Sequence, residues 1–472
     1  MGLKDAVVQR FSIADVKLEG NENVKELYKK NWAIAWPSVL EGALLSLMNS
    51  LDTMMVGSIG LSAIAAVGLV SQPRMILLLL SQSLCVGVTA VIARRKGEND
   101  QESANTCLKQ SLILMTVLGI LMAVLGVVFA GPFMRLVGAN DDTYEMSVTY
   151  FRVISAGMIF NYWSLCICAA LKAIGQTKVT LITNMTANII NIIFNYLLIG
   201  GNFGFPAWGV FGAAVATVFG TFVSCCIAFY FILRKSGYLH LKLFGKMDKD
   251  MSSLKSVMNV GSSSIAESVC LRIGFLINQK LVAGVGTAAY ATYYIVQQIS
   301  SLSFTVGDGL AVASTSLVGQ SLGQKRKDLA VAYVKVTRNM SIIISIILMV
   351  TIFSTRTLLA QLFTDDAAVI ADAAIAFTII VIGMIPQNGR IVYSGCLRGA
   401  GDTKYVAIIS LISVTIVRPL ATYFFCYPMD TIAPMLMFTV TGPWFSFFID
   451  SLLRSVLLKK RIDKGYWLNI RL

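Results

Sequence analysis

The chain is a succession of apolar segments, each about 20 to 30 residues long, separated by short polar breaks. Helices in the core of a soluble protein usually run for about 8 to 20 residues, whereas about 20 apolar residues are enough to cross a bilayer. Of the 472 residues, 56% are hydrophobic and only 14% are charged. That is too little charge to cover a soluble protein of this size, so we expect an all-α integral membrane protein.

Twelve segments are long enough to span a membrane, and several are longer than a perpendicular span needs, so we expect those to tilt or protrude. The first 31 residues are polar and lack an apolar stretch next to Met1, which argues against a cleaved signal peptide. The predicted spans are 32–56, 62–91, 107–134, 145–172, 178–200, 207–233, 252–283, 287–319, 330–362, 368–398, 404–428 and 432–458.

Lysine and arginine are distributed unevenly among the segments between the spans. With the N-terminus inside the cell, the inside segments carry 31 of the 39 basic residues, and the outside loops carry only Arg135 and Arg356. This bias is typical of cytoplasmic loops, so we expect a multi-pass protein of the cell (inner) membrane with both termini cytoplasmic. The basic residues are spread over seven short segments rather than one folded face, which argues against nucleic-acid binding.

The second half of the chain repeats the first with an offset of 226 residues. Chance similarity between apolar segments would not preserve this offset through glycines and loop residues. Both repeats carry six spans and share one orientation, which places a substrate site between them near the middle of the membrane. We expect two pseudo-symmetric six-helix lobes around a central cavity, an N-lobe (32–233) and a C-lobe (252–458). They are accompanied by a cytoplasmic N-terminal segment, a linker and a tail: 1–31, 234–251 and 459–472.

Ionisable groups inside spans are costly in lipid and are functional candidates for that reason. In the first half, Glu41 and Asp52 lie eleven residues apart, about three helical turns, and therefore share a face. The span 178–200 carries asparagines at spacings of 4, 3 and 4, which form one polar stripe. These amides could simply join helices through hydrogen bonds, or they could form a pocket with Asp52 for a proton or Na⁺. Our candidates for ion coupling are Asp52, Asn188, Asn191, Asn195 and Glu41; Asn184 completes the stripe.

The second half lacks this acid and these amides. Asn278 stands where the first half has Asp52, and Val414, Val417 and Ala421 stand where it has three asparagines. The first half is therefore the expected ion-coupling half. Among its charged residues, the second half carries Glu267, Arg272, Asp308, Arg390, Arg418 and Asp450, and we expect some of them to form buried ion pairs. Arg390 and Arg418 could instead face the cavity and favour an anionic or zwitterionic substrate. Our candidates for the substrate cavity are Glu267, Asn278, Gln298, Arg390 and Arg418.

The cysteines and the single histidine do not form a pattern typical of a catalytic or metal site. The nine cysteines fall almost entirely inside predicted spans, where they are expected to pack as small apolar residues rather than form disulfides. The single histidine, His240, lies in a polar loop away from any cluster of metal-ligating residues. With no paired nucleophile and base and no phosphate-binding loop, we expect neither an enzyme nor a cofactor.

Several motifs resemble those of the multidrug and toxic compound extrusion (MATE) transporters. The resemblance covers essentially the whole chain and rests on a combination of segments rather than on one motif. These segments are Pro37–Glu41, Leu51–Gly57, Gly60–Gly68, Ile190–Ile199, Gly209 with Gly212–Thr217, Ala283–Ala289, Val318–Gly323 and Cys396–Thr403.

The resemblance implies a secondary antiporter that exports organic cations by alternating access, in exchange for H⁺ or Na⁺. It implies a coupling role for Asp52; some members carry an acid where this chain has the amide of Asn195. Other members use acids in the seventh and tenth helices, near Glu267 and Gln387 here. We expect a monomer that binds a small organic substrate in the bilayer, with Arg398 and Asp402 closing the inner mouth of the cavity. Alternatives are a lipid-linked precursor flippase, an exporter of an anionic or zwitterionic metabolite, and a membrane enzyme.

The charge bias makes the topology testable by cysteine labelling. Single cysteines placed within 137–143 or 202–205 should react with an impermeant reagent added to intact cells. Cysteines within 98–102 or 243–248 should react only after the cells are opened. Labelling of 243–248 in intact cells would rule out the twelve-span topology.

Overall fold

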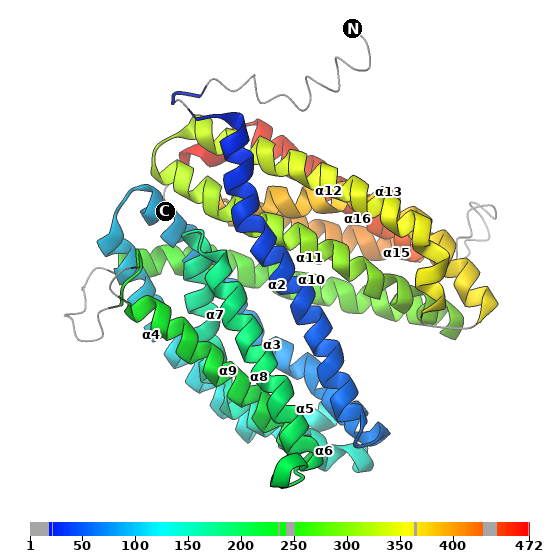
Figure 1. The fold of residues 1–472 in the computed structure, drawn as a ribbon. Helices are drawn as coiled ribbons and strands as arrows, with labels where there is room; N and C mark the ends of the chain where they lie inside the picture. The colour runs from blue at the N-terminus through cyan, green and yellow to red at the C-terminus, as the bar shows by residue number, and fades with distance from the viewer. Residues whose placement is uncertain are drawn as a thin grey trace. The chain divides into compact units, whose positions relative to one another are not determined.

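The computed structural model describes residues 18–20, 22–234, 237–241, 251–362, 366–427, 441–470 and 472. These residues are almost entirely helical and contain no strand, which confirms the all-α prediction (Figure 1). Most of the predicted linker 234–251 and the start of the predicted span 432–458 lie outside the described residues.

Most helices follow one another with short connections. Within the described residues, ten helices are long and apolar enough to cross a membrane, and α6 with α7 adds an eleventh if that bent pair is counted as one span. The elements are α2 Val24–Gly57, α3 Leu61–Gly97, α4 Gln101–Val128, α5 Ala130–Val137, α6 Asp141–Ala156, α7 Met158–Ala173, α8 Thr177–Gly200, η1 Asn202–Gly204, α9 Gly209–Leu233, α10 Ser252–Val285, α11 Thr287–Gly323, α12 Lys327–Gln361, α13 Ala367–Ala400, α14 Thr403–Ser410, η2 Leu411–Val417, α15 Arg418–Cys426, α16 Gly442–Asp463 and η4 Tyr466–Asn469.

Three predicted spans differ from the observed helices. The span 107–134 is broken after Val128, where α5 begins. The span 145–172 is the α6–α7 pair, bent by 50° at Gly157. A Cβ atom at Gly157 would lie 2.6 Å from Val218 of α9, so only glycine allows this approach. The span 404–428 contains a turn of π-helix, η2, between α14 and α15.

Aspartate side chains cap the starts of α4 and α13. Asp100 accepts a hydrogen bond from the backbone N–H of Ser103 (3.0 Å) and caps α4. The Ser103 hydroxyl and this backbone bond lower the pKa of Asp100. Asp366 caps α13 in the same way through the backbone N–H groups of Ala368 and Val369. Each cap satisfies donors that the first helical turn leaves without a partner.

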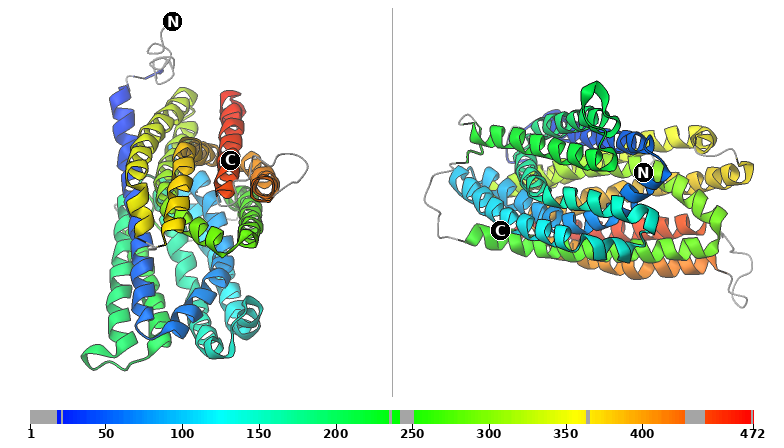
Figure 2. Two further views of the ribbon diagram at one scale, coloured as in Figure 1. Left: turned by 90° about the vertical axis from the view of Figure 1, so that its right-hand side faces the viewer. Right: turned by 90° about the horizontal axis from the view of Figure 1, so that it is seen from below.

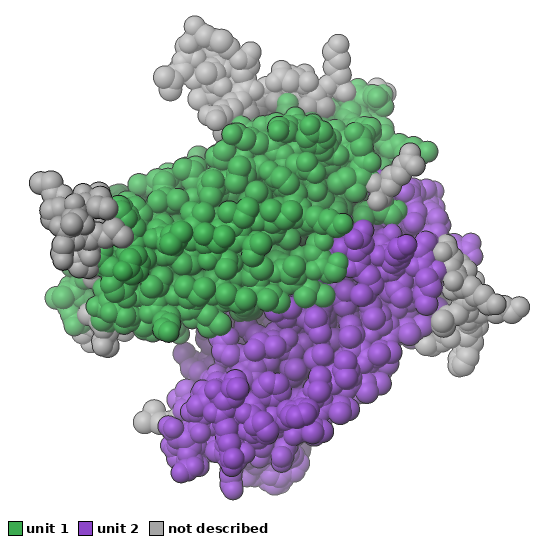
Figure 3. Space-filling model, turned by 180° about the vertical axis from the view of Figure 1, so that it is seen from behind, with its two compact units in different colours: residues 1–39, 262–472 green, residues 40–261 purple. Residues whose placement is uncertain are grey.

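The chain forms two compact units. Unit 1 comprises residues 1–39 and 262–472, and unit 2 comprises residues 40–261 (Figure 3). The division falls within α2 and within α10, so each of these helices contributes residues to both units. In unit 1, the bundle contains α11, α12 and α13 packed side by side (Figures 1 and 2).

The backbone itself repeats with the offset of 226 residues. The unusual φ angles recur in pairs: 142° at Gly60 and 143° at Gly286, and 86° at Gly175 and 89° at Gly401. The helices that follow the first pair, α3 and α11, begin and end at the same offset. A positive φ is costly for residues with a side chain. The repeat is therefore one of structure as well as of sequence, which confirms the pseudo-symmetric fold.

In unit 1, α13 packs against α11 through two glycines one turn apart. A Cβ atom at Gly395 would lie 2.8 Å from the carbonyl oxygen of Ala311, and one at Gly399 would lie 2.4 Å from that of Thr315. The Thr315 hydroxyl lies 2.8 Å from the Gly395 carbonyl oxygen. Small residues at this spacing let helix backbones approach closely in membranes, where van der Waals contact drives helix association.

We expect Gly399→Ala to lower the melting temperature of the protein in nanodiscs, because the added methyl group must push α13 away from α11. The loss should be on the order of 1–3 kcal/mol, as for an overpacked core. Gly68→Ala is the matched control, since a Cβ atom there meets nothing within 4 Å. Equal melting temperatures for the two variants would show that this contact does not limit stability.

Candidate functional site

The polar stripe of α8 lies beside the second half of α2, within unit 2. Asn184 donates to Glu41 and Asn195 donates to Asp52, and both pairs are separated by 143 positions. Eleven residues separate the two contacts on each helix, so the helices run parallel with no change of register. This length is about three turns, or roughly 16 Å. The stripe therefore connects two carboxylates at different depths.

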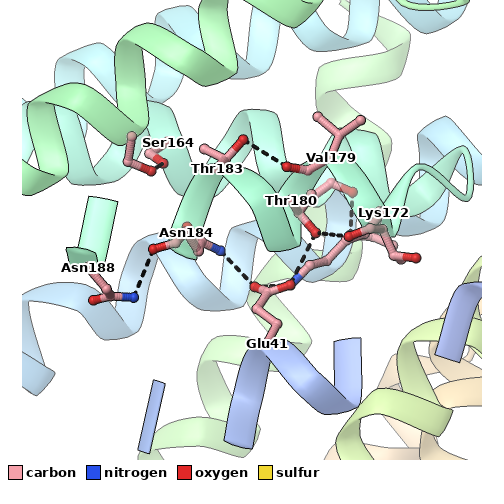
Figure 4. A network of polar contacts seen from close by, with 12 residues as sticks. Glu41, Ser164, Lys172, Val179, Thr180, Thr183, Asn184 and Asn188 are labelled. Atoms are coloured by element: carbon pink, nitrogen blue, oxygen red, sulfur yellow. Dashed lines mark hydrogen bonds and ion pairs between the residues drawn. The ribbon is translucent and has the colours of Figure 1, made fainter. Parts of the chain in front are cut away.

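Glu41 is fixed by three partners (Figure 4). Its Oε1 accepts hydrogen bonds from Lys172 Nζ at 2.9 Å and from Asn184 Nδ2 at 2.7 Å, and Thr180 Oγ1 lies 3.1 Å from Oε2. The Glu41 side chain is 6% exposed. A cationic partner in direct contact balances the negative charge of a buried carboxylate. This end of the stripe is suited to holding α2, α7 and α8 together.

Asp52 makes fewer polar contacts than Glu41. It is half-buried and accepts a hydrogen bond from Asn195, whose side chain is fully buried. Among the described residues, no ion pair within 4.0 Å includes Asp52; Arg74 of α3 acts on it only as an electrostatic neighbour. Asn195 Nδ2 also lies 3.4 Å from Asn191 Oδ1. The hydrogen bond to the Asp52 carboxylate therefore comes from a neutral amide.

The other amides of the stripe make local contacts. Asn188 donates to the backbone carbonyl of Asn184 at 2.8 Å, and Asn191 Nδ2 lies 3.3 Å from the hydroxyl of Thr217 on α9. The Asn195 side-chain oxygen has no hydrogen-bond partner in the described part of the chain. Oxygens from Asp52, Asn191, Asn195 and Thr217 thus gather around one end of the stripe.

The second half repeats the Glu41 arrangement in unit 1. Glu267 accepts a hydrogen bond from Arg398 at 2.8 Å and from Ser410 at 3.1 Å. The sequence separations, 131 and 143, are those of the pairs that Glu41 forms with Lys172 and Asn184. Each unit therefore carries the same anchored glutamate at the same place in its repeat.

Beyond the π-helical turn η2, the corresponding contacts of the two halves no longer have the same sequence separation. Asn278 makes its contact with Thr422 (2.6 Å), 144 positions away, whereas Asp52 meets Asn195 at a separation of 143. A π-helical turn accommodates an extra residue, and η2 lies between Ser410 and Thr422. Thr422, rather than Ala421, is thus the structural counterpart of Asn195. The first half has a carboxylate and an amide where the second half has an amide and a hydroxyl.

The five residues predicted for the substrate cavity are not alike in exposure. Glu267, Asn278 and Arg418 are buried inside unit 1, Arg390 is half-buried beside Phe304, and Gln298 is exposed. The predicted gating residues also have fixed partners. Arg398 pairs with Glu267, and Asp402 accepts a hydrogen bond from Arg461 Nε at 2.7 Å.

Sequence reasoning missed the partners of the buried acids. Asp450 pairs with Arg454 at 2.6 Å, and Glu267 pairs with Arg398, so buried ion pairs form as expected. Neither arginine belongs to the set of second-half charges considered for pairing, because both were counted with the cytoplasmic ends of helices. The i, i+4 spacing of Asp450 and Arg454 is the signal that could have identified one pair. Arg272 of that set is exposed.

The described residues contain no group of three or more His, Cys, Asp or Glu side chains that could hold a metal ion. All nine cysteines are free.

Comparison with known proteins gives consistent matches along the chain. The family model MatE matches residues 37–197 and again residues 264–424. A probable multidrug resistance protein NorM of Thermotoga maritima is 27% identical over 450 residues, which cover 94% of each chain. The uncharacterized transporter YisQ of Bacillus subtilis is 26% identical over 444 residues, covering 93% of this chain and 94% of YisQ.

Two solved structures have similar folds. One is an outward-facing multidrug resistance MATE family transporter of the MOP superfamily (TM-score 0.85, 21% identity, 98% of each chain). The other is a MOP superfamily transporter from Pyrococcus furiosus, described as having a binding pocket of reverse polarity that suggests a different function. Its TM-score is 0.83 at 21% identity, over 96% of this chain and 100% of that one. At this identity the structures establish the fold alone.

The Glu41 contacts can be tested with a double-mutant cycle. Lys172→Met should destabilise the protein by on the order of 2 kcal/mol, because a buried carboxylate loses its cation. Glu41→Gln removes the charge itself, so adding Lys172→Met to it should cost much less. Denaturation of the four proteins in nanodiscs measures both effects. Additive losses would mean that the two side chains do not interact.

Proposed function

The chain belongs to the MATE family of multi-pass membrane transporters, and on that premise we propose that it exports drug-like organic cations in exchange for H⁺ or Na⁺. The relatives with printed functions are probable multidrug resistance proteins. The proposal adds three points to family membership: the direction of transport, the charge of the substrate and the coupling ion.

The observation that carries the proposal is the contrast between the two carboxylates of the stripe. Glu41 has a direct cationic partner and two further polar partners, whereas Asp52 accepts a hydrogen bond from a neutral amide. An ionisable group at membrane depth is costly unless it serves function or is paired. Asp52 is therefore the carboxylate whose charge can change during a transport cycle, and Glu41 is a structural anchor.

The amide of Asn195 can serve both charge states of Asp52. In the observed orientation its N–H₂ group donates to the carboxylate, as suits the ionised form. A protonated Asp52 could donate to the Asn195 oxygen, which lacks a partner among the described residues. The same oxygens, with those of Asn191 and Thr217, are the hard ligands that Na⁺ prefers. The cycle then alternates between an ion bound at Asp52 and an empty carboxylate that allows a cationic substrate to bind.

The driving force is adequate for such a cycle. Moving one charge through 100 mV supplies about 2.3 kcal/mol, a bias of roughly fiftyfold. We further propose that the protein lies in the cell membrane with both termini cytoplasmic and acts as a monomer. In this scheme the Arg398–Glu267 and Asp402–Arg461 contacts stabilise the closed inner mouth.

A second candidate is export of an anionic or zwitterionic metabolite. Arg390 is half-buried in unit 1 with its guanidinium 5.6 Å from the ring centroid of Phe304, a position from which it could meet a carboxylate. The Pyrococcus furiosus structure described by its reverse pocket polarity makes this candidate worth testing. Counterflow in liposomes with a cationic dye and with a zwitterionic drug would distinguish the two candidates.

We expect Asp52→Asn to reduce coupled efflux of a cationic dye from proteoliposomes to background under both H⁺ and Na⁺ gradients, because the neutral amide cannot release and take up charge. The variant should remain folded and inserted. Asn278→Ala, at the corresponding position of the second half, should retain most of the rate. Wild-type efflux by Asp52→Asn under either gradient would refute coupling at this site.

A further inference from the structure

Arg418 is buried inside unit 1, where a charge is least expected. It is 1% exposed and is the first residue of α15, directly after the π-helical turn η2. Its guanidinium lies 5.0 Å from the ring centroid of Phe275 on α10 and 5.1 Å from that of Phe447 on α16. The side chain is thus enclosed by aromatic rings.

Cation–π contact leaves the hydrogen-bonding needs of Arg418 unmet. None of its three side-chain nitrogens has a hydrogen-bond partner in the described part of the chain. A guanidinium carries five N–H donors. The two rings attract the positive charge, but each such contact contributes only about 0.5–2 kcal/mol. This is small beside the cost of removing an ion from water.

Both carboxylate oxygens of the neighbouring Asp450 already accept hydrogen bonds from other side chains. Asp450 lies on α16 one turn beyond Phe447, and it is fully buried. One of its oxygens accepts a hydrogen bond from Arg454 at 2.6 Å and the other from Ser413 at 2.5 Å. Asp450 therefore acts on Arg418 through space, without a hydrogen bond between them.

The local charges do not balance. Arg390, Arg418 and Arg454 all act electrostatically on Asp450, and Asp308 acts on Arg390 as a second acid. Among the described residues, this group contains three positive and two negative side chains. Asp308 is exposed, so the imbalance inside the unit is at least one positive charge. A buried excess of this kind is stabilised most directly by a bound anion.

A second unpartnered donor lies near Phe447. The ring of Trp444 is 1% exposed, and its centroid lies 6.2 Å from that of Phe447. Its Nε1 has no hydrogen-bond partner within the described ranges. Indole nitrogen can only donate. Two buried donor groups with unmet hydrogen-bonding needs thus lie near one ring in the same unit.

We propose that Arg418 is the anchor of a buried site in unit 1 for one small monovalent anion, a halide or the carboxylate of a formate-sized molecule. One negative charge offsets the excess, and its lone pairs accept from the guanidinium. The enclosing rings of Phe275 and Phe447 restrict the site to a small ligand. This inference concerns the interior of one unit and does not depend on the proposed transport function.

The first test uses purified full-length protein in nanodiscs, with its melting temperature measured against increasing sodium bromide, chloride or formate. Sodium gluconate, whose anion is too large for the site, replaces the salt at constant ionic strength. We expect a saturable rise with each small anion. Arg418→Gln should lose this rise. Arg272→Gln, which removes an exposed arginine of α10, should keep it.

A rise of equal size in gluconate, or one that survives intact in folded Arg418→Gln, would overturn the proposal. Should Arg418→Gln fail to fold, the wild-type protein provides the decision. Anomalous diffraction from crystals grown in bromide should give a peak within hydrogen-bond distance of the Arg418 guanidinium. If bromide raises the melting temperature but crystals show a well-ordered Arg418 with no bromide peak beside it, the site is equally refuted. Protection by bromide and chloride but not by formate would assign the site to halides, and the reverse would assign it to carboxylates.

Discussion

The cost of an uncompensated charge in a low-polarity environment governs the interior of this protein. Water solvates unpaired charges at a soluble surface, but helices in a bilayer must find partners among themselves. Glu41, Glu267 and Asp450 obey this constraint, since each has a basic partner within 2.9 Å. The Glu41 and Glu267 pairs connect helices that are far apart in sequence, so they stabilise the packing as well as the charges, whereas the Asp450 pair lies within α16.

The same constraint singles out the residues that depart from it. Asp52 is a half-buried carboxylate with a neutral hydrogen-bond partner, and Arg418 is a buried guanidinium without one in the described residues. Their surroundings differ in kind. Amide and hydroxyl oxygens gather near Asp52, whereas aromatic rings surround Arg418. A group bordered by adaptable amides can change its charge state, whereas a permanently charged guanidinium needs a permanent counter-charge.

The two halves share the anchored glutamate but differ at the polar pair about three turns further along the helix. Both retain an anchored glutamate with a cation 131 positions further along the chain. Beyond it, the first half continues with regular helix to Asp52 and Asn195, while the second half contains η2 and reaches Asn278 and Thr422. The extra residue shifts the register of α15 against α10 by one position. The common framework thus carries a carboxylate, Asp52, in the first half where the second half has the amide of Asn278.

The sequence by itself determined the fold class and the repeat, because long apolar segments and recurring glycines are local features with direct physical consequences. It also indicated that Glu41, Asp52 and the asparagines share faces, since the helical period fixes which residues lie together on one helix. Only the tertiary structure decided which partners they meet. Pairing depends on the rotation and register of one helix against another, and η2 shifts that register without a clear sequence signal. The tertiary structure likewise determined the bend at Gly157 and the pairing of Glu267 with Arg398. They depend on contacts between segments distant in sequence, which no periodicity along a single segment encodes.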